Sequence, residues 1–372
     1  MSPTAGPQGP PVAVHQFVPT LNPRDATGSH TLMLRDILRA AGWRSEIFAE
    51  AIHDDLADQA FKHWMYPDHA AAGDVAIYQF STSSAVAGYL AEREVPLIVN
   101  FHNFTGPNFF AGWEPRTEQR AALAAAELAL LAPRAELGIA DSEYNARDLR
   151  RAGCRRTTVI PVLADYGRLR TAPDPRVAAA LAADKARGGI DLLFVGRVVP
   201  SKAQHELVEA LWAIRRLYDP AARLHIVGGT SSFEYVKALR SFIADLDLTG
   251  AVRLTGEVSD AALAAYFDGA DTYLSLSAHE GFGVPLAEAM AAGVPVVARQ
   301  AGAVAATVGS AALLLSGDDP SYVAAAVDRV CRDATLRQYL VAAGRQRAAE
   351  LSGDAVARSM VEAVASVAGE PR

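Results

Sequence analysis

The chain has 372 residues, which is long enough for two domains of ordinary size, each with its own core. Its 35 lysine and arginine residues are outnumbered by 42 aspartate and glutamate residues, and the net charge of −7 gives no general attraction to nucleic acid. Cys154 and Cys331 are the only cysteines, which are too few for a disulfide framework and are compatible with a reducing compartment.

Residues 1–11 are rich in proline and glycine and lack the charged start and apolar middle of a signal peptide, so we expect a flexible tail there. No apolar run approaches the length of a membrane span. We therefore expect a cytoplasmic location, with membrane contact only at the periphery.

From residue 12 onward, short apolar runs rich in valine and isoleucine alternate with helical patterns. In the first half we expect strands at 12–17, 44–48, 74–80, 96–101, 137–140 and 158–163, and helices near 29–41, 83–92, 115–131 and 142–152. In the second half we expect strands at 191–197, 223–227, 252–255, 272–276, 294–298 and 312–315. This alternation is typical of βαβ units. The sequence therefore predicts an α/β protein with two doubly wound, parallel-sheet domains.

Composition marks the break between the two series of strands. Residues 165–189 contain Pro173, Pro175, an alanine run and two adjacent glycines, with no strand pattern. The predicted organisation is a tail at 1–11, a first domain at 12–165, a connection at 166–189, a second domain at 190–350 and a last helical segment at 351–372.

Open parallel sheets bind ligands at the carboxyl ends of their strands, so residues that directly follow strands are the first candidates. Arg197 and Lys202 follow the first strand of the second domain. Two cations at this spacing can converge on one diphosphate, the arginine as a fork and the lysine as a point charge. Gly196 lets the backbone approach a ligand closely. The alternative is a solvated loop whose charges are incidental.

Residues 280–298 form a glycine loop followed by a short helical pattern. Pro285 suits the first helical position, and Gly293 suits the position after the last. The N–H groups of Gly281, Phe282 and Gly283 would point out of the helix start, as an anion site requires.

Two carboxylates flank this loop. Glu280 could accept hydrogen bonds from sugar hydroxyls, and Glu288 could take two ribose hydroxyls. The alternatives are that Glu288 only complements the helix dipole and that Glu280 only binds local amides.

The pattern E-x7-E from Glu280 to Glu288, together with Gly196-Arg197 and Lys202, resembles the family 4 retaining glycosyltransferases of GT-B fold. The resemblance covers the second domain well and the first domain loosely. It implies two Rossmann-like domains that face each other across a cleft, with the last helix returning to the first domain.

The resemblance also implies roles for individual residues. Arg197 and Lys202 would hold the donor diphosphate and stabilise the leaving group. Glu288 would bind the ribose, and Glu280 would bind the donor sugar. The implied backbone contacts are the amides of Gly281, Phe282 and Gly283 with the donor sugar and phosphate, and Gly256, Glu257 and Val258 with the nucleotide base.

In the first domain, the family has a histidine near the donor sugar at a strand end, and His102 is the best match. His15 lies mid-strand and His30 within the first helix, so they fit less well; a structural role at the strand end is the alternative for His102. The loop 25–30 resembles the family's glycine loop, although it has one glycine where two adjacent ones are common. Gly28 would contact phosphate or acceptor, or it simply begins a helix capped by Thr27.

Two other features of the first domain have open alternatives. The aromatic loop 101–113 forms either an acceptor platform or lid, or a loop buried between domains. The arginine run at 147–156 meets an anionic lipid or acidic acceptor, or is a solvated helix end.

The resemblance implies a metal-independent enzyme that moves a sugar from a nucleoside-diphosphate sugar to an acceptor hydroxyl with retention. Positive charge at the diphosphate would stabilise its departure, and the departing phosphate oxygen would take the acceptor's proton. Domain closure would exclude water. No side chain stands out as a general base, which disfavours an inverting enzyme.

No metal or cofactor is expected. Asp245-Leu-Asp247 is the only Asp-x-Asp and lies in a helical stretch, and no Cys/His cluster suggests zinc. No G-x-G-x-x-G follows the first strand of either half, which disfavours a dinucleotide-dependent dehydrogenase. Two alternatives stay open: a sugar-nucleotide epimerase or hydrolase of the same fold, and a non-catalytic sugar-nucleotide-binding protein. The donor base, the donor sugar and the acceptor are not predicted.

Overall fold

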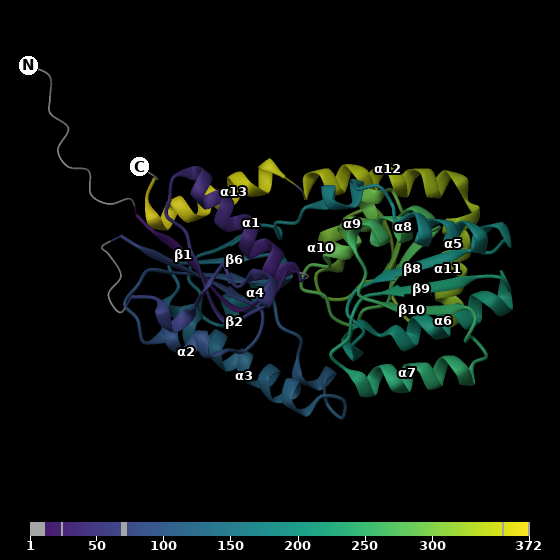
Figure 1. Ribbon diagram of the computed structural model, residues 1–372, viewed down its shortest axis with the longest axis horizontal. Coiled ribbons are helices and arrows are strands. Elements are labelled where there is room, and N and C mark those ends of the chain that lie inside the picture. Colours follow the sequence, from purple (N-terminus) through teal and green to yellow (C-terminus); the bar gives the residue numbers. More distant parts are fainter. Residues whose placement is uncertain (1–11, 24, 68–72, 352, 371–372) are drawn as a thin grey trace, which may run out of the picture. The chain divides into compact units, whose positions relative to one another are not determined.

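The computed structural model describes residues 12–23, 25–67, 73–351 and 353–370, so the expected tail at 1–11 lies outside the described residues. The chain divides into two compact units, whose elements are labelled in Figure 1. Unit 1 comprises the described parts of Met1–Phe104, Arg120–Ala164 and Asp354–Arg372, and unit 2 those of Thr105–Gln119 and Asp165–Gly353.

Unit 1 contains a seven-stranded sheet in the order β3-β2-β1-β4-β5-β6-β7, in which every neighbouring pair is parallel. Its strands are β1 (Val14–Leu21), β2 (Ile47–Ile52), β3 (Phe61–Lys62), β4 (Val75–Phe80), β5 (Leu97–Phe101), β6 (Leu137–Ala140) and β7 (Thr157–Val159). Its α-helices are α1 (Ala26–Ala41), α2 (Ala85–Ala91), α3 (Pro115–Leu131), which begins within the unit 2 segment, α4 (Glu143–Arg151) and α13 (Asp354–Ala368). Short 3-10 turns are η1 (Asp54–Leu56), η2 (His63–Met65), η3 (Pro107–Phe109) in the segment grouped with unit 2, and η4 (Ala132–Arg134).

Both faces of this sheet are buried, because successive side chains of a strand point to opposite faces. On β4, Val75 and Ile77 pack with α1 and α13, whereas Tyr78 and Phe80 pack with α2, α3 and α4. Helix α13 lies beside α1, with Met360 fully buried in this core (Figure 1). The last helix is therefore part of unit 1.

Unit 2 contains a six-stranded parallel sheet in the order β10-β9-β8-β11-β12-β13. Its strands are β8 (Asp191–Val195), β9 (Arg223–Val227), β10 (Val252–Gly256), β11 (Thr272–Ser275), β12 (Val296–Arg299) and β13 (Ala312–Leu315). Its helices are η5 (Tyr166–Arg170), α5 (Pro175–Ala186), η6 (Pro200–Lys202), α6 (Gln204–Leu217), α7 (Phe233–Asp245), α8 (Asp260–Gly269), α9 (Val284–Ala292), α10 (Val304–Val308), α11 (Pro320–Arg332) and α12 (Ala334–Glu350).

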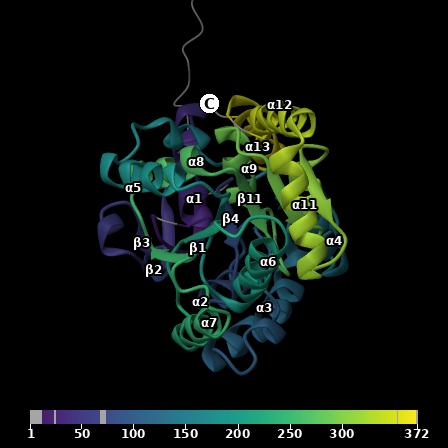
Figure 2. The same cartoon turned by 90° about the vertical axis from the view of Figure 1, so that its right-hand side faces the viewer.

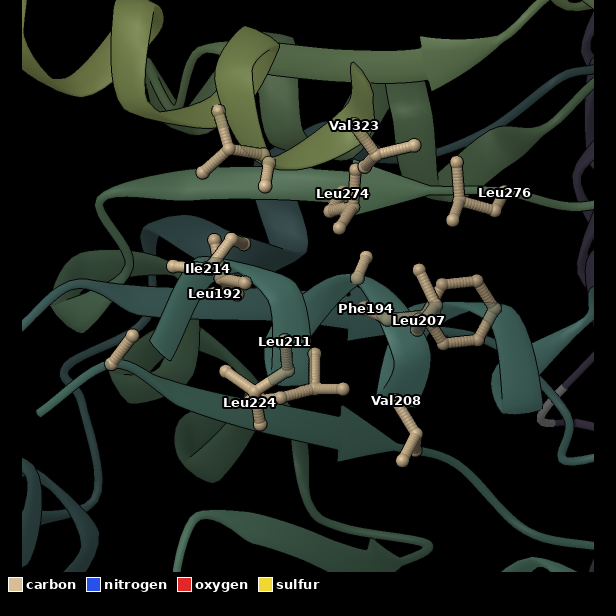
Figure 3. Packing of buried hydrophobic residues seen from close by; sticks show 14 of the residues in the cluster. Leu192, Phe194, Leu207, Val208, Leu211, Ile214, Leu224, Leu274, Leu276 and Val323 are labelled. Atoms are coloured by element: carbon tan, nitrogen blue, oxygen red, sulfur yellow. The ribbon is translucent and has the colours of Figure 1, made fainter. Parts of the chain in front are cut away.

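The main core of unit 2 lies between one face of its sheet and helices α6, α7 and α11. Figure 3 shows Leu192, Leu224 and Leu274 of three adjacent strands meeting leucine and isoleucine side chains of α6. Val323 of α11 joins the same cluster, and Figure 2 shows α6 and α11 side by side. The predicted α/β class with two doubly wound parallel sheets is confirmed.

The segment 166–189 differs from the expected connection. It contains η5 and α5, and α5 packs against α8, with Leu181 buried close to Gly269. Asp174 caps α5 through its side chain and Pro175 begins the helix, so the proline that suggested a linker is a helix-start signal here. This segment is an integral part of unit 2.

Candidate active site

The loops that follow β8, β9 and β10 are joined at the carboxyl edge of the unit 2 sheet. Gly196 donates to the Val227 carbonyl at 2.9 Å, and Gly228 donates to the Gly256 carbonyl at 3.0 Å. Gly228 has φ 145°, and a Cβ there would lie 2.1 Å from the Gly196 carbonyl oxygen. Only glycine lets these two loops approach so closely. Val258, the predicted base contact, is half-buried just beyond β10.

Lys202 and Glu280 meet in this region although they lie 78 residues apart in the sequence. Lys202 Nζ donates to Glu280 Oε1 at 2.7 Å, and the two side chains are 21% and 12% exposed. A backbone bond from Ala278 to the Ser201 carbonyl at 3.0 Å ties the same two loops together. The two predicted donor-binding motifs are therefore one cluster, because β8 and β11 are neighbours in the sheet.

Arg197 lies at the start of the same loop with its side chain exposed to solvent. Its carbonyl oxygen accepts a hydrogen bond at 2.9 Å from Nε2 of Gln204, a buried residue in the first turn of α6. The backbone is thus held while the guanidinium can approach a ligand.

The glycine loop before α9 turns its carbonyl groups toward α10. The Glu280 carbonyl accepts from the Ala303 amide at 2.9 Å, and the Phe282 carbonyl accepts from Thr307 Oγ1 at 2.5 Å. In a trans peptide the N–H points opposite to the C=O, so the amides of the following residues, Gly281 and Gly283, are directed away from α10. With the positive end of the α9 dipole behind them, these amides suit an anion. Helix α9 begins at Val284, so Pro285 is its second residue and not its first.

Glu288 lies on α9 with its side chain only 3% exposed. Its Oε1 accepts from Nε and Nη2 of Arg168 at 3.1 and 2.5 Å, and Arg168 Nη1 also donates to Asp260 at 3.1 Å. Burial raises the pKa of Glu288, and the adjacent Arg168 opposes that shift. Arg168 was not predicted from the sequence, because it is one of four arginines in a segment interpreted as a connection and no local pattern singles it out.

In unit 1, His102 has both ring nitrogens engaged and a side chain 5% exposed. Two glutamine side chains determine which atom of Gln79 faces His102. Gln16 Nε2 donates to the Thr31 carbonyl at 3.0 Å, so Gln16 Oε1 is left as an acceptor. Gln79 Nε2 donates to this oxygen at 2.7 Å. Gln79 Oε1 is then the acceptor that faces His102 Nε2 at 2.8 Å, so Nε2 carries a hydrogen. The other nitrogen, Nδ1, lies 3.0 and 3.1 Å from the two carboxylate oxygens of Asp141.

Because Nε2 is already protonated, the contact between Nδ1 and Asp141 requires a second proton shared by ring and carboxyl. Burial raises the pKa of Asp141, and His102 opposes that shift through its charge and its hydrogen bond. The side chain of His102 is therefore a fixed part of a buried network in unit 1.

His30 belongs to the same network and not to the surface. It is fully buried, its ring centroid lies 4.8 Å from that of His102, and its Nδ1 accepts from the Leu163 amide at 3.0 Å. Burial lowers its pKa well below the usual value, with the neighbouring His102 as a second cause, so it is neutral.

Gly28 lies in the first turn of α1, where its amide donates to Asp25 Oδ1 at 2.6 Å. Asp25 is the N-cap of the helix, so the alternative of a helix capped by Thr27 is wrong in its capping residue. A Cβ at position 28 would lie 1.9 Å from the Asn22 carbonyl oxygen. Close backbone packing therefore accounts for this glycine.

The aromatic loop and the arginine run of the first domain make contacts with nearby side chains. Phe101 and Phe104 pack into the unit 1 core against Phe80. In the arginine run, Arg150 makes a bidentate pair with Glu143, as expected for a solvated helix end.

Within the described residues, no helix is both long and apolar enough to cross a bilayer. The same residues hold no group of three or more His, Cys, Asp or Glu side chains placed to bind a metal ion.

The family model for glycosyl transferases group 1 matches residues 182–347, which include Arg197, Lys202, Glu280 and Glu288 but not Arg168. Beyond this segment, the chain is 32% identical over 269 residues to the GDP-mannose-dependent alpha-(1-6)-phosphatidylinositol monomannoside mannosyltransferase of Mycobacterium tuberculosis, covering 60% of this chain and 69% of that protein. The chain belongs to the group 1 glycosyl transferases, the family 4 enzymes of GT-B fold. The resemblance inferred from Glu280, Glu288, Arg197 and Lys202 is confirmed.

Other members of this family are similar over much of the chain. The D-inositol 3-phosphate glycosyltransferase of Geodermatophilus obscurus is 33% identical over 300 residues, which are 77% of this chain and 65% of that protein. The chain spans 47% of the length of the protein of the same name in Frankia alni.

Solved structures agree on the fold. HepE of Anabaena, in complex with UDP and glucose, matches with a TM-score of 0.72 at 21% identity over 95% of this chain and all of that chain. The sucrose-phosphate synthase of Thermosynechococcus elongatus matches with a TM-score of 0.72 at 19% identity over 95% of this chain and 98% of that chain.

The structure thus brings together Lys202, Glu280 and the glycine loop, and places Arg197 and Glu288 on the same edge of unit 2. His102 and Gly28 lie in unit 1. The roles of all these residues, the domain boundaries other than the connection at 166–189, and the cytoplasmic location stay predictions.

Proposed function

We propose that this chain transfers a sugar from a nucleoside-diphosphate sugar to an acceptor hydroxyl with retention of configuration. The observation that carries the proposal is the Lys202–Glu280 pair, 2.7 Å apart, beside the amides of the glycine loop. A cation, a sugar-binding carboxylate and a helix N-terminus in one cluster suit the anionic and hydroxyl-rich end of such a donor. The name of the mycobacterial relative includes GDP-mannose, and HepE was solved with UDP, which supports a nucleoside-diphosphate donor.

In this proposal, Arg197 and Lys202 stabilise the charge that develops on the departing diphosphate. Fixed cations and backbone amides are most effective where that charge appears, because they need no reorganisation during the reaction. They supply the positive charge that a metal ion provides in other transferases, so we propose a metal-independent reaction.

Retention without a protein nucleophile is supported by the state of the two carboxylates. Glu280 is bound to Lys202 and Glu288 to Arg168, so each carboxylate already has an oxygen engaged by a cation and neither is held as a free nucleophile. The departing phosphate oxygen would take the proton of the acceptor hydroxyl as the new bond forms on the same face of the sugar.

The first test is a thermal-shift screen with UDP, GDP and ADP and their common sugars, since a ligand that binds only the folded state raises its melting temperature. Turnover is then measured with and without acceptors in the presence of EDTA, beginning with inositol phosphates because the relatives from Geodermatophilus and Mycobacterium have inositol in their names. Donor consumption without acceptor would instead indicate an epimerase or hydrolase. Binding without any turnover would indicate a sugar-nucleotide-binding protein, and failure of every nucleotide to bind would refute the proposal.

A further inference from the structure

Arg168 connects two parts of unit 2 that the proposed function assigns to the nucleotide. It belongs to η5, 120 residues before Glu288 in the sequence. Its guanidinium bridges Glu288 on α9 and Asp260 at the start of α8, directly after the loop proposed to meet the base. One side chain thus joins the proposed ribose and base contacts.

Glu288 needs such a partner, because a carboxylate with a side chain 3% exposed is costly to ionise alone. Burial is the main influence on its pKa and raises it, Arg168 opposes this by charge and hydrogen bonding, and Asp260 adds to the rise. The titratable and charged groups that interact with Glu288 come from η5, α8 and β11. They are Arg168, Tyr166, Asp260 and Tyr273.

The contact with Arg168 uses only one of the two carboxylate oxygens of Glu288. Arg168 approaches Glu288 through Oε1 with both Nε and Nη2, and within the described part of the chain no hydrogen bond is made to Oε2. A carboxylate held on one oxygen keeps the lone pairs of the other for hydroxyl donors. A neutral glutamic acid would have fewer acceptor sites for vicinal hydroxyls.

We propose that Arg168 is a positioning residue for the donor: it keeps Glu288 ionised and fixed in orientation so that the free carboxylate oxygen accepts the ribose hydroxyls. This inference rests on the proposed function, since it presumes a nucleotide at Glu288. Through its contact with Asp260, Arg168 also fixes the end of the loop after β10 relative to Glu288. The opposite role, in which Arg168 occupies the ribose position and is displaced by the nucleotide, predicts the opposite effect of its removal.

The test is the Kd for UDP and GDP, measured by titration calorimetry between about pH 6 and about pH 8.5, where a group of raised pKa titrates and most carboxylates do not. In wild type the pH dependence expected over this range is that of the ligand's terminal phosphate, whose second ionisation lies at about pH 6, so the Kd of each variant is divided by the wild-type Kd at the same pH. In Arg168→Met, Glu288 loses the influence that keeps it ionised, so Kd should rise about tenfold for each pH unit below the pKa of Glu288 and recover at high pH. Arg168→Lys retains a charge and should restore most of the affinity and remove the pH dependence.

Three variants separate this role from general damage. Arg170→Met removes an exposed arginine from the same 3-10 turn and should bind as wild type does. Glu288→Gln should bind weakly at every pH, because an amide cannot be ionised. Asp260→Asn, which keeps the contact between Arg168 and Glu288, should show no pH dependence.

The outcomes are distinct. A wild type that binds neither UDP nor GDP overturns the proposed function. A wild type that binds, with Arg168→Met showing equal or tighter affinity at every pH, overturns only the role of Arg168. A uniform loss in Arg168→Met that is the same at every pH would also overturn it, because a structural role does not depend on the ionisation of Glu288.

Discussion

Replacing Lys202 by methionine removes one charge from the cluster while retaining most of the volume of the side chain. Lys202 and Glu280 are 2.7 Å apart and mostly shielded from solvent, so a charge on the departing diphosphate would be weakly screened here. Loss of one such fixed donor costs about 3 kcal/mol of transition-state stabilisation. We therefore expect kcat to fall roughly 150-fold.

The effect on folding should be much smaller. Without Lys202, Glu280 loses its partner at a site that water can still reach, which costs about 1 kcal/mol of unfolding free energy. The assay is product formation by mass spectrometry at saturating donor, with the melting temperature of each variant measured in parallel.

Lys185→Met is the matched control. Lys185 also pairs with a carboxylate of unit 2, Asp271, but near the amino ends of β8 and β11, away from the edge that carries Lys202. Its kcat should stay within about twofold of wild type. A folded Lys202→Met enzyme with kcat within about threefold of wild type would refute the assignment of Lys202 to the leaving group.

Three further predictions concern the two folded units. In Asp141→Asn the downfield proton signal shared by His102 Nδ1 and the carboxyl should disappear from the NMR spectrum, because the amide of the new residue would donate to Nδ1; persistence of the signal would contradict the proposed protonation. In Gly28→Ala the new Cβ would lie 1.9 Å from the Asn22 carbonyl, so the backbone must move at a cost of about 2 kcal/mol, lowering the melting temperature by roughly 4–8 °C; an unchanged value would contradict the packing argument. For Asp191, burial is outweighed by hydrogen bonds from a histidine and an arginine, which hold its pKa well below the usual range. The stability that ionised Asp191 adds is present above its unfolded-state pKa and is lost as the pH falls through its lower folded-state pKa. Asp191→Asn should therefore lower the free energy of unfolding by about 3 kcal/mol at neutral pH. In acid denaturation followed by circular dichroism, the stabilities of wild type and variant should converge as the pH falls.

Much of the fold could be predicted because its signals are local. Apolar runs bounded by turn residues predict strands, and a helical period between them predicts the crossovers of parallel sheets. The spacing from Glu280 to Glu288 and the glycines between them predict a loop, a helix start and two carboxylates on one short segment. The same locality explains the error at 166–189, where a proline that begins α5 has the same appearance as a proline in a linker.

The partners of the site residues are decided by tertiary structure. Lys202 meets Glu280 only because β8 lies next to β11, although β9 and β10 come between them in the sequence, and no local pattern encodes that strand order. The contact of Arg168 with Glu288 spans 120 residues, and that of His102 with Asp141 spans 39. Residue type and spacing thus determined which groups were available for chemistry. Burial and pairing, which follow from the packing of distant segments, determined their protonation and which of their atoms stay open to a ligand.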